Sequence, residues 1–303
     1  MPYDIIGDVH GHAGRLEALL RVMDYEKHAS GWRHAERIAV FVGDLIDRGP
    51  EQVETLILVR DMVEAGAARI AMGNHELNAI AYATPDPDAP GQHLRPRTAK
   101  NAHQHKAFID AVGLDTPLHR EWTDWFRTLP LWIDEANFRV VHACWHPQSV
   151  AVLEPLLNDR RLTDEVIVAG HRKDSPEYRA LETLLKGPEI ELPDGYGFID
   201  KDGHDRHAVR ARWWLGAPET YRDAYIGPDD VVIPDLPLPP GAVFATPDRP
   251  VFIGHYWLNP KNPPAPLTDK VACVDFSVAR GGPMMAYRFD GETQLAASKF
   301  VSA

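Results

Sequence analysis

The sequence predicts an α/β fold with a mostly parallel sheet, and three observations support this prediction. Short apolar runs alternate with stretches of helical periodicity through residues 1–83, the pattern of parallel strands joined by crossover helices. Polar motifs directly follow these runs, and ligands of such sheets collect at the carboxyl ends of the strands. Hydrophobic residues make up 44% of the 303 residues, enough for a large core. We predict one domain over residues 1–303 with two insertions, at about 84–107 and 173–250.

Three strand–turn–helix units open the chain. Each has a short apolar strand, a polar turn and then residues at helical spacing, such as Leu16, Leu19 and Leu20 in the first unit. The second helix has Pro50 at its start and Gly66 at its end, as many helices do. The expected strands are 3–6, 37–42 and 68–72, and the expected helices cover residues 16–23, about 51–66 and 76–83.

Further along the chain, the sequence predicts a helix, a hairpin, two buried strands and two closing strands. Residues 121–129 look helical, and a hairpin follows around the polar residues 134–137. Two apolar runs, 166–169 and 251–253, are candidates for buried strands, and each is followed by Gly-His. Apolar residues alternate around Cys273 and again around Tyr287. This alternation predicts two closing strands, 271–275 and 285–289, joined across Gly281-Gly282 as an antiparallel edge.

Charge and composition exclude several classes of function. The chain has 32 basic and 44 acidic residues, a formal net charge of −12, which repels polyanions and excludes a general nucleic-acid binder. Two cysteines, Cys144 and Cys273, are too few for a disulfide framework, which favours a reducing, cytoplasmic location. No stretch approaches the roughly 20 apolar residues of a membrane span. The sequence leaves the oligomeric state open.

Five motifs place polar side chains directly after apolar runs. They read Gly-Asp-Val-His-Gly from residue 7, Gly-Asp-Leu-Ile-Asp-Arg-Gly from residue 43, Gly-Asn-His-Glu from residue 73, Val-His-Ala from residue 141 and Gly-His-Tyr from residue 254. Mixed oxygen and nitrogen donors of this kind suit two adjacent divalent cations, with Asp44 suited to bridge them. The expected metal ligands are Asp8, His10, Asp44, Asn74, His142 and His255.

The same motifs supply groups for phosphoryl transfer to water. Two cations about 3.5–4 Å apart lower the pKa of bound water toward roughly 7, so the chemistry needs no protein nucleophile. Arg48 is expected to fork onto phosphate oxygens. His75 is a candidate general acid for the leaving oxygen, and Asp47 would hold its ring and keep it protonated. These assignments predict a binuclear phosphoesterase.

The motifs resemble those of the calcineurin-like metallophosphoesterase superfamily, closest to the phosphoprotein phosphatase and symmetrical diadenosine tetraphosphate hydrolase branch. The likeness covers roughly residues 1–82, 126–145 and 251–290. It implies an αββα sandwich with mixed sheets, helices outside and the two loop-rich insertions forming a cap. It also implies that Asp8, His10 and Asp44 hold one metal, that Asp44, Asn74, His142 and His255 hold the other, and that Asp47, Arg48 and His75 assist the chemistry.

The resemblance is uneven between the two branches. The segment Cys273-Val-Asp-Phe-Ser-Val-Ala-Arg-Gly-Gly is similar to the last part of the dinucleotide hydrolases, although it departs from them in detail. The protein phosphatases usually carry glycines after the Val-His motif, whereas Ala143-Cys144-Trp145 stands here. This departure weakens the expectation of a protein substrate.

Residues outside the motifs are candidates for substrate binding. The resemblance leads us to expect a second phosphate-binding arginine between His142 and His255, and Arg212 or Arg210 is nominated by placement. Tyr256, next to the last ligand, is a further candidate. The insertion residues Trp213 and Trp214 either stack on a nucleobase or pack the insertion, and the sequence does not decide.

The remaining histidines carry weaker expectations. His171 is interpreted as a structural histidine at least as readily as a ligand, and it is left out of the metal set. The other histidines of the polar insertions are expected to be solvated, at positions 93, 103, 105, 204 and 207.

The leading hypothesis is a cytoplasmic, two-metal phosphoesterase that cleaves phosphomonoesters by direct attack of water, in the manner of a serine/threonine phosphatase. Manganese is the expected ion, with iron, zinc, cobalt and nickel as alternatives. The alternative function is a symmetrical bis(5'-nucleosyl)-tetraphosphate hydrolase, and a non-catalytic module that binds phosphorylated ligands is the third hypothesis. The expected partner is a phosphorylated small molecule, a nucleotide or a phosphopeptide, without a membrane.

Overall fold

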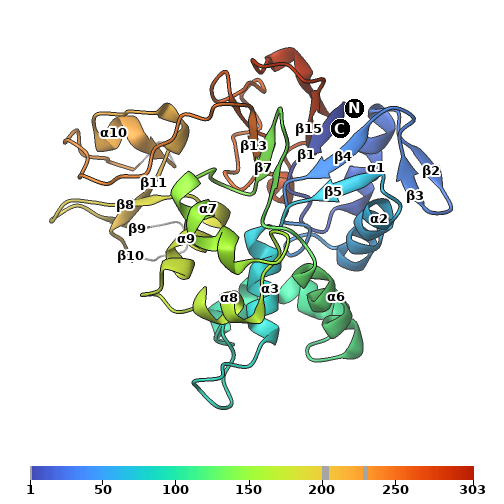
Figure 1. The fold of residues 1–303 in the computed structure, drawn as a ribbon, viewed down its shortest axis with the longest axis horizontal. Helices are drawn as coiled ribbons and strands as arrows, with labels where there is room; N and C mark the ends of the chain where they lie inside the picture. Colours follow the sequence, from blue (N-terminus) through green and yellow to red (C-terminus); the bar gives the residue numbers. More distant parts are fainter. Residues whose placement is uncertain (1, 200–204, 228–230) are drawn as a thin grey trace.

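Two β-sheets pack face to face at the centre of the computed structural model, which describes residues 2–199, 205–227 and 231–303 (Figure 1). The first sheet has the order β16-β15-β1-β4-β5, and the second has the order β14-β13-β7-β6. The first consists of β1 (Tyr3–Ile6), β4 (Ile38–Phe41), β5 (Ala68–Ile70), β15 (Met285–Phe289) and β16 (Phe300–Ser302). The second consists of β6 (Trp132–Asp134), β7 (Arg139–Val141), β13 (Val251–Ile253) and β14 (Val271–Cys273).

Both sheets are mixed. In the first, β1, β4 and β5 are parallel, as the three opening units predict, while β15 runs antiparallel to β1. In the second, β13 is parallel to both β7 and β14, and the predicted hairpin of β6 and β7 is antiparallel. Because β1, β4 and β5 are parallel neighbours, their carboxyl ends lie at the same edge of the sheet. The loops that follow these three strands therefore lie close together.

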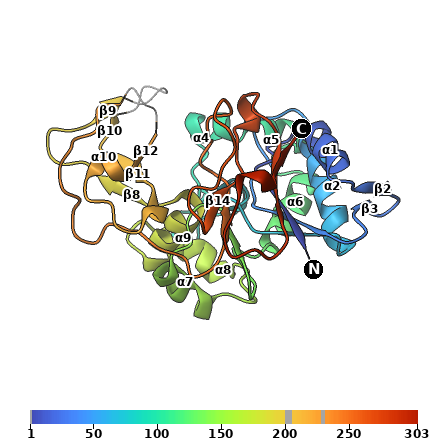
Figure 2. The ribbon, with the colours of Figure 1, turned by 90° about the horizontal axis from the view of Figure 1, so that it is seen from above.

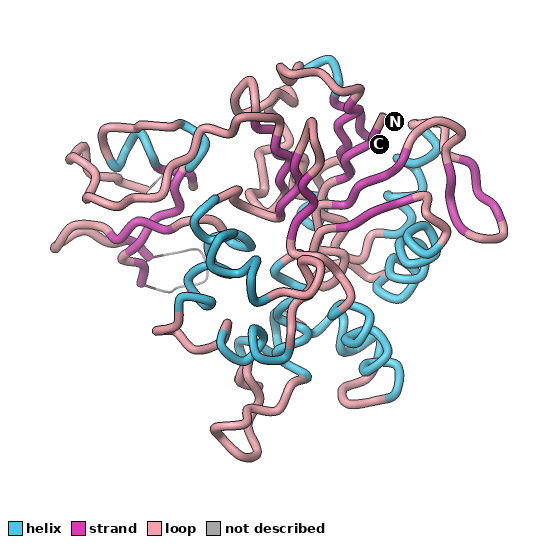
Figure 3. The backbone as a smooth tube through the Cα atoms, in the orientation of Figure 1, coloured by secondary structure: helices cyan, strands magenta, loops and turns pink. Residues whose placement is uncertain are grey.

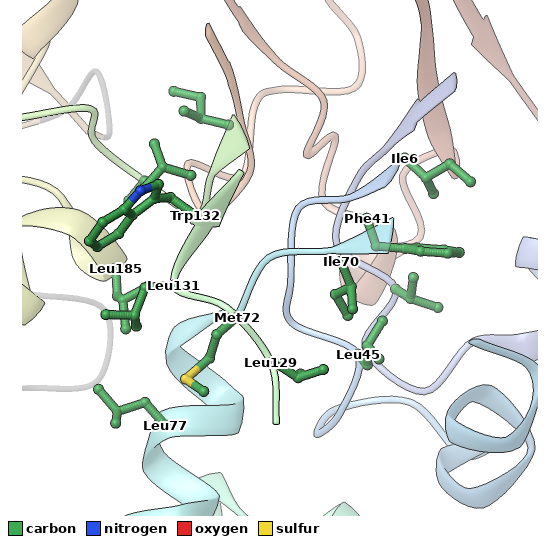
Figure 4. Close-up of a cluster of buried hydrophobic side chains, with 14 of the residues drawn as sticks. Ile6, Phe41, Leu45, Ile70, Met72, Leu77, Leu129, Leu131, Trp132 and Leu185 are labelled. Carbon is green, nitrogen blue, oxygen red and sulfur yellow. The ribbon is translucent and has the colours of Figure 1, made fainter. Parts of the chain in front are cut away.

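The hydrophobic core has two layers, because successive strand residues point to opposite faces. Ile5 and Val40 face inward between the sheets, where they meet Phe138, Phe252 and Phe289 of the partner strands and of β15. The adjacent residues of β1, β4 and β5 face outward and pack against the helices. Figure 4 shows this outer cluster, which includes Ile6, Phe41, Ile70, Leu77, Leu131, Trp132 and Leu185.

Helices cover the outer faces of the sandwich (Figures 1 and 3). The predicted helices of the opening units are present, and the helix expected over 121–129 begins earlier, where Thr116 caps it. A fully buried leucine, valine or phenylalanine side chain on such a face contributes about 1.5–3 kcal/mol. The helices are α1 (Ala13–Val22), α2 (Gln52–Glu64), α3 (Asn74–Ala83), α6 (Pro117–Arg127), α7 (Pro147–Leu153), α8 (Asp164–Ala169) and α9 (Pro176–Lys186).

The two insertions are more ordered than a loop-rich cap. The first contains two short helices, α4 (Ala99–Gln104) and α5 (Lys106–Val112). The second begins with α9 and continues into a small sheet of order β12-β11-β8, which extends to one side of the sandwich (Figure 2). This part has its own small core, built around Ile190, Val209 and Tyr221. Its elements are β8 (Glu189–Glu191), β9 (Phe198–Ile199), β10 (Asp205–Arg206), β11 (Ala208–Ala211), α10 (Tyr221–Ala224) and β12 (Tyr225–Ile226).

Two predictions about secondary structure were wrong. Residues 166–169 lie in helix α8, because Thr163 caps its first turn and two acidic residues follow, which outweighs the strand preference of the valines. The two closing strands do not form a hairpin. After β14 the chain turns at Ser277, whose φ is +61°, and crosses to the other sheet, where β15 pairs with β1.

Two smaller features complete the described structure. A hairpin that the sequence did not predict, β2 (Glu26–His28) with β3 (Gly31–Arg33), lies between α1 and β4. Within the described ranges, no helix combines the length and the apolar character that crossing a membrane requires.

Candidate metal centre

The five motifs meet where the strands of both sheets end, and Asp44 lies at the middle of the group. Its Oδ2 atom is 3.3 Å from Nε2 of His142 and 3.8 Å from Nε2 of His10. Nε2 of His75 is also 3.8 Å from this oxygen. One carboxylate oxygen therefore faces imidazole nitrogens from three separate motifs, the position expected of a bridging ligand.

Hydrogen bonds to the backbone orient two of the histidines predicted to bind metal. Nδ1 of His10 donates to the carbonyl oxygen of Ile46 at 2.8 Å, and Nδ1 of His142 donates to that of Val42 at 2.8 Å. Nδ1 carries a proton in each ring, so each ring, when neutral, offers the lone pair of Nε2 to a cation. Nε2 of His10 is buried and has no hydrogen-bond partner in the described chain.

The remaining predicted ligands, Asn74, His255 and Asp8, lie next to these donors. The Oδ1 atom of Asn74 lies 3.1 Å from Nε2 of His142 and 2.8 Å from Nδ1 of His255. The backbone amide of His255 donates to Oδ2 of Asp8 at 3.1 Å. Nε2 of His255 is buried and, like that of His10, has no partner among the described residues.

The backbone is held in an unusual conformation at these motifs. Positive φ angles occur at His10 (+48°), Asp44 (+53°), Asp47 (+67°), Arg48 (+75°) and His255 (+71°). Such angles are uncommon outside glycine and cluster at functional sites, where surrounding contacts maintain them. The close approach also requires the glycine before His255, since a Cβ atom there would lie 2.0 Å from Oδ1 of Asp8.

Burial and crowding shift the pKa values of the donors. Burial lowers the pKa of His10 to about 4, with the nearby His75 ring acting in the same direction, so His10 is neutral and able to ligate. Burial raises the pKa of Asp8 well above its ordinary range, and the carboxylates of Asp275 and Asp44 add to this. Burial opposes ionisation of Asp44 too, but the His142 and His75 rings hold the pKa of Asp44 well below its usual value.

These donors fit two divalent cations. Two groups of residues, each with ligand atoms within 4.8 Å of one another, share Asp44: one adds His10 and His75, the other His142 and His255. The first group holds the orphaned Nε2 of His10, the second that of His255. Positive charge placed between them would stabilise the crowded carboxylates.

The predicted catalytic residues lie beside these donors. Nδ1 of His75 donates to Oδ2 of Asp47 at 2.5 Å, and both side chains are buried. Against the effect of burial, the negative charges of Asp44 and Asp47 raise the pKa of His75. Arg48, in contrast, is exposed. The ring that is predicted to donate a proton is thus buried and paired, while the guanidinium predicted to bind phosphate is exposed.

Comparison with known proteins identifies the family. A family model described as calcineurin-like phosphoesterase matches residues 1–193, which is more than half of the chain. The chain belongs to this family. The predicted superfamily, the sandwich architecture and the hydrolase class are thereby confirmed.

Two curated relatives of this phosphoesterase are bacterial bis(5'-nucleosyl)-tetraphosphatases. The asymmetrical enzyme PrpE of Bacillus velezensis is 45% identical over 76 residues, which cover 25% of this chain and 30% of the relative. The symmetrical enzyme of Vibrio cholerae is 32% identical over 193 residues, which cover 63% of this chain and 58% of the relative. The chain therefore spans less than two thirds of the length of each.

A solved structure shares the fold of the phosphoesterase. The protein serine/threonine phosphatase from Saccharomyces cerevisiae with similarity to human phosphatase PP5 gives a TM-score of 0.54. The match covers 100% of this chain and 79% of that chain, at 14% sequence identity. At this identity the likeness concerns the fold alone.

His105 lies beside the candidate site, and the sequence reasoning missed it. It was expected to be solvated, which was wrong: its ring is buried, and Nδ1 donates to Oδ1 of Asp47 at 2.9 Å. The ring lies between Tyr82 and Phe108, with centroid distances of 5.3 and 5.0 Å. Asp47 therefore accepts a hydrogen bond from His75 on one oxygen and from His105 on the other. Of the other insertion histidines, His204 lies outside the described residues.

Two buried acids also support the centre without being among the predicted residues. Glu76, the last residue of the Gly-Asn-His-Glu motif, accepts hydrogen bonds from the backbone amides of Asp44, Leu45 and Gly73 at 2.8–3.0 Å. It thereby ties the second motif to the third. Asp275 plays a similar part after β14, where it accepts from the amides of Trp257 at 2.7 Å and Ser277 at 2.9 Å. The position of Glu76 three residues into a helix start was a usable signal.

The candidate substrate residues take different positions. Arg212 is exposed, and its Nε donates to the carbonyl oxygen of Tyr225 at 2.6 Å. Arg210 lies close enough to His255 for its charge to depress the pKa of that histidine, after burial as the main cause. Tyr256 is buried, with its ring 5.2 Å from Trp214 and its hydroxyl without a hydrogen-bond partner in the described chain.

The insertion tryptophans and His171 have structural contacts. Trp213 is fully buried and its indole donates to the carbonyl oxygen of Ala143 at 2.9 Å, so it anchors the second insertion to the loop after β7. Trp214 is buried against Trp213 and Tyr256. Nδ1 of His171 donates to the carbonyl oxygen of Ile167 at 2.7 Å. This hydrogen bond ties the residue just after helix α8 back to the last turn of that helix.

Proposed function

We propose that this chain is a binuclear metal-dependent phosphoesterase that hydrolyses phosphomonoesters. The observation that supports this most is the convergence of imidazole, carboxylate and amide donors on Asp44, next to the buried pair of His75 and Asp47. Asp8, His10 and Asp44 would hold one cation, and Asp44, Asn74, His142 and His255 the other. Manganese is the proposed ion, with iron, zinc, cobalt or nickel as alternatives.

The side chains divide the work of hydrolysis. When bound, the cations supply positive charge for the phosphate and lower the pKa of water toward neutrality. Arg48 forks onto non-bridging oxygens and stabilises the charge that develops there. His75 donates its Nε2 proton to the leaving oxygen, and Asp47 fixes the ring through Nδ1. For contacts beyond Arg48 we propose Arg210, which faces His255, ahead of Arg212, which is bound to a backbone carbonyl.

A symmetrical bis(5'-nucleosyl)-tetraphosphate hydrolase is the second candidate function. The relative from Vibrio cholerae, whose printed name gives that activity, aligns over 193 residues. The products separate the two candidates. Two nucleoside diphosphates released from diadenosine tetraphosphate would support the second candidate, whereas inorganic phosphate released from monoesters would support the first.

Removal of the metals provides the test of the proposed function. Because every proposed ligand is a protein side chain that a chelator can outcompete, chelation should abolish hydrolysis of p-nitrophenyl phosphate. Added manganese should restore it, with two equivalents of ion bound per chain at saturation. A colour assay of released p-nitrophenol measures the hydrolysis, and elemental analysis measures the number of bound ions. Full activity in a metal-free sample would contradict the proposal.

The His105→Ala variant should lower kcat through Asp47. Without the second hydrogen bond, the Asp47 carboxylate is free to rotate and holds His75 less firmly. A hydrogen bond to a charged group contributes about 1.5–3 kcal/mol, which corresponds to roughly a ten- to hundredfold loss. The loss should be larger for alkyl phosphates, whose poor leaving groups need the proton, than for p-nitrophenyl phosphate.

The control is His103→Ala, two residues earlier and exposed on α4. It should leave the rate within about twofold, the size of an ordinary surface substitution. His105→Asn keeps an N–H donor and should recover part of the rate. If the His105→Ala variant loses the same factor on aryl and alkyl substrates, the residue has only a packing role.

A further inference from the structure

Two arginines from separate loops share the ring of Trp257 beside the candidate metal centre. The guanidinium carbon of Arg280 lies 4.3 Å from the indole centroid, and that of Arg48 lies 5.7 Å from it. The ring of His10, a proposed ligand, is 5.9 Å from the same indole. Trp257 thus connects the candidate metal centre, the predicted phosphate-binding Arg48 and a second arginine, Arg280, that the five motifs do not include.

The two guanidinium groups have no acidic partner in the described chain. Both side chains are exposed, and no described carboxylate lies within ion-pair distance of either. Other arginines of the chain are neutralised locally, as Arg37 is by Asp4 and Asp290. Partial burial lowers the pKa of Arg280, and the positive charge of Arg48 lowers it further. Like charges held together without a counter-charge form a site for an anion.

The fold holds these groups in place. Trp257 has a φ of +51°, a strained value for a bulky residue, and its amide is fixed by the buried Asp275. The same carboxylate binds the amide of Ser277, which starts the turn that leads to Arg280. On the far side of Arg280, Nη1 of Arg15 donates to the carbonyl oxygen of Gly282. Strained residues that persist through such contacts are typical of ligand clamps.

We propose that Arg48 and Arg280 bind successive phosphates of a phosphoanhydride substrate across the Trp257 ring. This inference rests on the proposed function, since Arg48 and the metal centre hold the phosphate that is attacked. A monoester brings one phosphate and needs only Arg48. A substrate with a P–O–P linkage brings a second, adjacent phosphate, and Arg280 supplies the planar, permanently charged fork for it.

Hydrolysis of the anhydride balances without a further reactant. Water forms a bond to the phosphorus held at the metal centre, and the bond from that phosphorus to the bridging oxygen breaks. The bridging oxygen leaves on the phosphate held by Arg280. His75 donates a proton to the leaving oxygen, the attacking water loses a proton to solvent, and His75 then takes up a proton from solvent.

The Arg280→Gln variant tests this site in the manganese-loaded protein. Loss of one charge-assisted contact should lower kcat/KM for ADP by roughly ten- to a hundredfold more than it lowers kcat/KM for p-nitrophenyl phosphate. Arg280→Lys, which keeps the charge without the fork, should fall between wild type and glutamine. Arg33→Gln, an exposed arginine of the β2–β3 hairpin, is the control and should leave the ratio of the two substrates unchanged.

Binding without turnover provides the second measurement. Imidodiphosphate, whose bridging nitrogen resists hydrolysis, should raise the unfolding temperature of the loaded wild-type protein more than orthophosphate does. Arg280→Gln should lose that additional rise. The assignment of Arg280 would be overturned if Arg280→Gln lowered kcat/KM equally for ADP and p-nitrophenyl phosphate. It would also be overturned if imidodiphosphate still raised the unfolding temperature of this variant more than orthophosphate does, by the wild-type margin. A wild-type protein that hydrolyses neither substrate contradicts the proposed function, and the binding measurement then decides the inference alone.

Discussion

Asp44→Asn should abolish metal-dependent hydrolysis. The Oδ2 atom of Asp44 faces Nε2 atoms of His10, His75 and His142, so the substitution removes the one charge that both proposed ions share. We expect kcat to fall by at least about a thousandfold, beyond the 10²–10³ cost of one hydrogen-bond donor to the transition state. Elemental analysis of the same sample should show fewer than two ions per chain.

A matched control separates this effect from general damage. Asp290→Asn removes a surface carboxylate just after β15, where it pairs with Arg37 and Lys299 at the opposite end of the first sheet. Asp290 itself is exposed and lies far from the candidate donors, so activity and metal content should persist even if the protein is somewhat less stable. An Asp44→Asn protein with two ions and normal turnover would show that the donors do not form a shared centre.

His75→Gln should cause the second-largest loss, and its size should depend on the leaving group. A positioned general acid contributes about 10²–10⁴ in rate. His75 is buried against Asp47 and its pKa is raised, so it carries the proton that an alkoxide leaving group requires. We expect the full loss on alkyl phosphates and a smaller one on p-nitrophenyl phosphate, measured as kcat at saturating substrate.

Metal content must be measured alongside this variant, since His75 also lies 3.8 Å from Asp44. His28→Gln, in the exposed β2–β3 hairpin, serves as the control for loss of a histidine. A uniform loss across leaving groups, together with fewer bound ions, would reassign His75 from proton donor to ligand.

The cluster of candidate donors could be anticipated because its members follow strands. In a parallel arrangement, the loops after β1, β4 and β5 must meet at one edge, so Asp8, Asp44 and Asn74 were predictable neighbours from the sequence. The donors His142 and His255 follow β7 and β13 of the second sheet in the same way. The nomination of ligands from motif and strand position thus required no knowledge of the helices.

His105 and the Arg280 site could not be anticipated in this way. His105 comes from the junction of two short helices, α4 and α5, and reaches Asp47 only because its ring packs between Tyr82 and Phe108. Arg280 depends on Asp275, a buried carboxylate whose partners are backbone amides and leave no trace in side-chain patterns. The strand predicted at 166–169 failed for a local reason, since valine-rich runs of that length do not distinguish helix from strand.

The positive φ angles at the ligands have a consequence for metal selection. Contacts with the protein hold His10, Asp44 and His255, and the glycine before His255 lies too close to Asp8 for a side chain. A pre-formed cradle of this kind favours the ions whose preferred geometry matches the donor positions that it holds. Geometry, together with supply in the cell, would then decide which ion the protein carries.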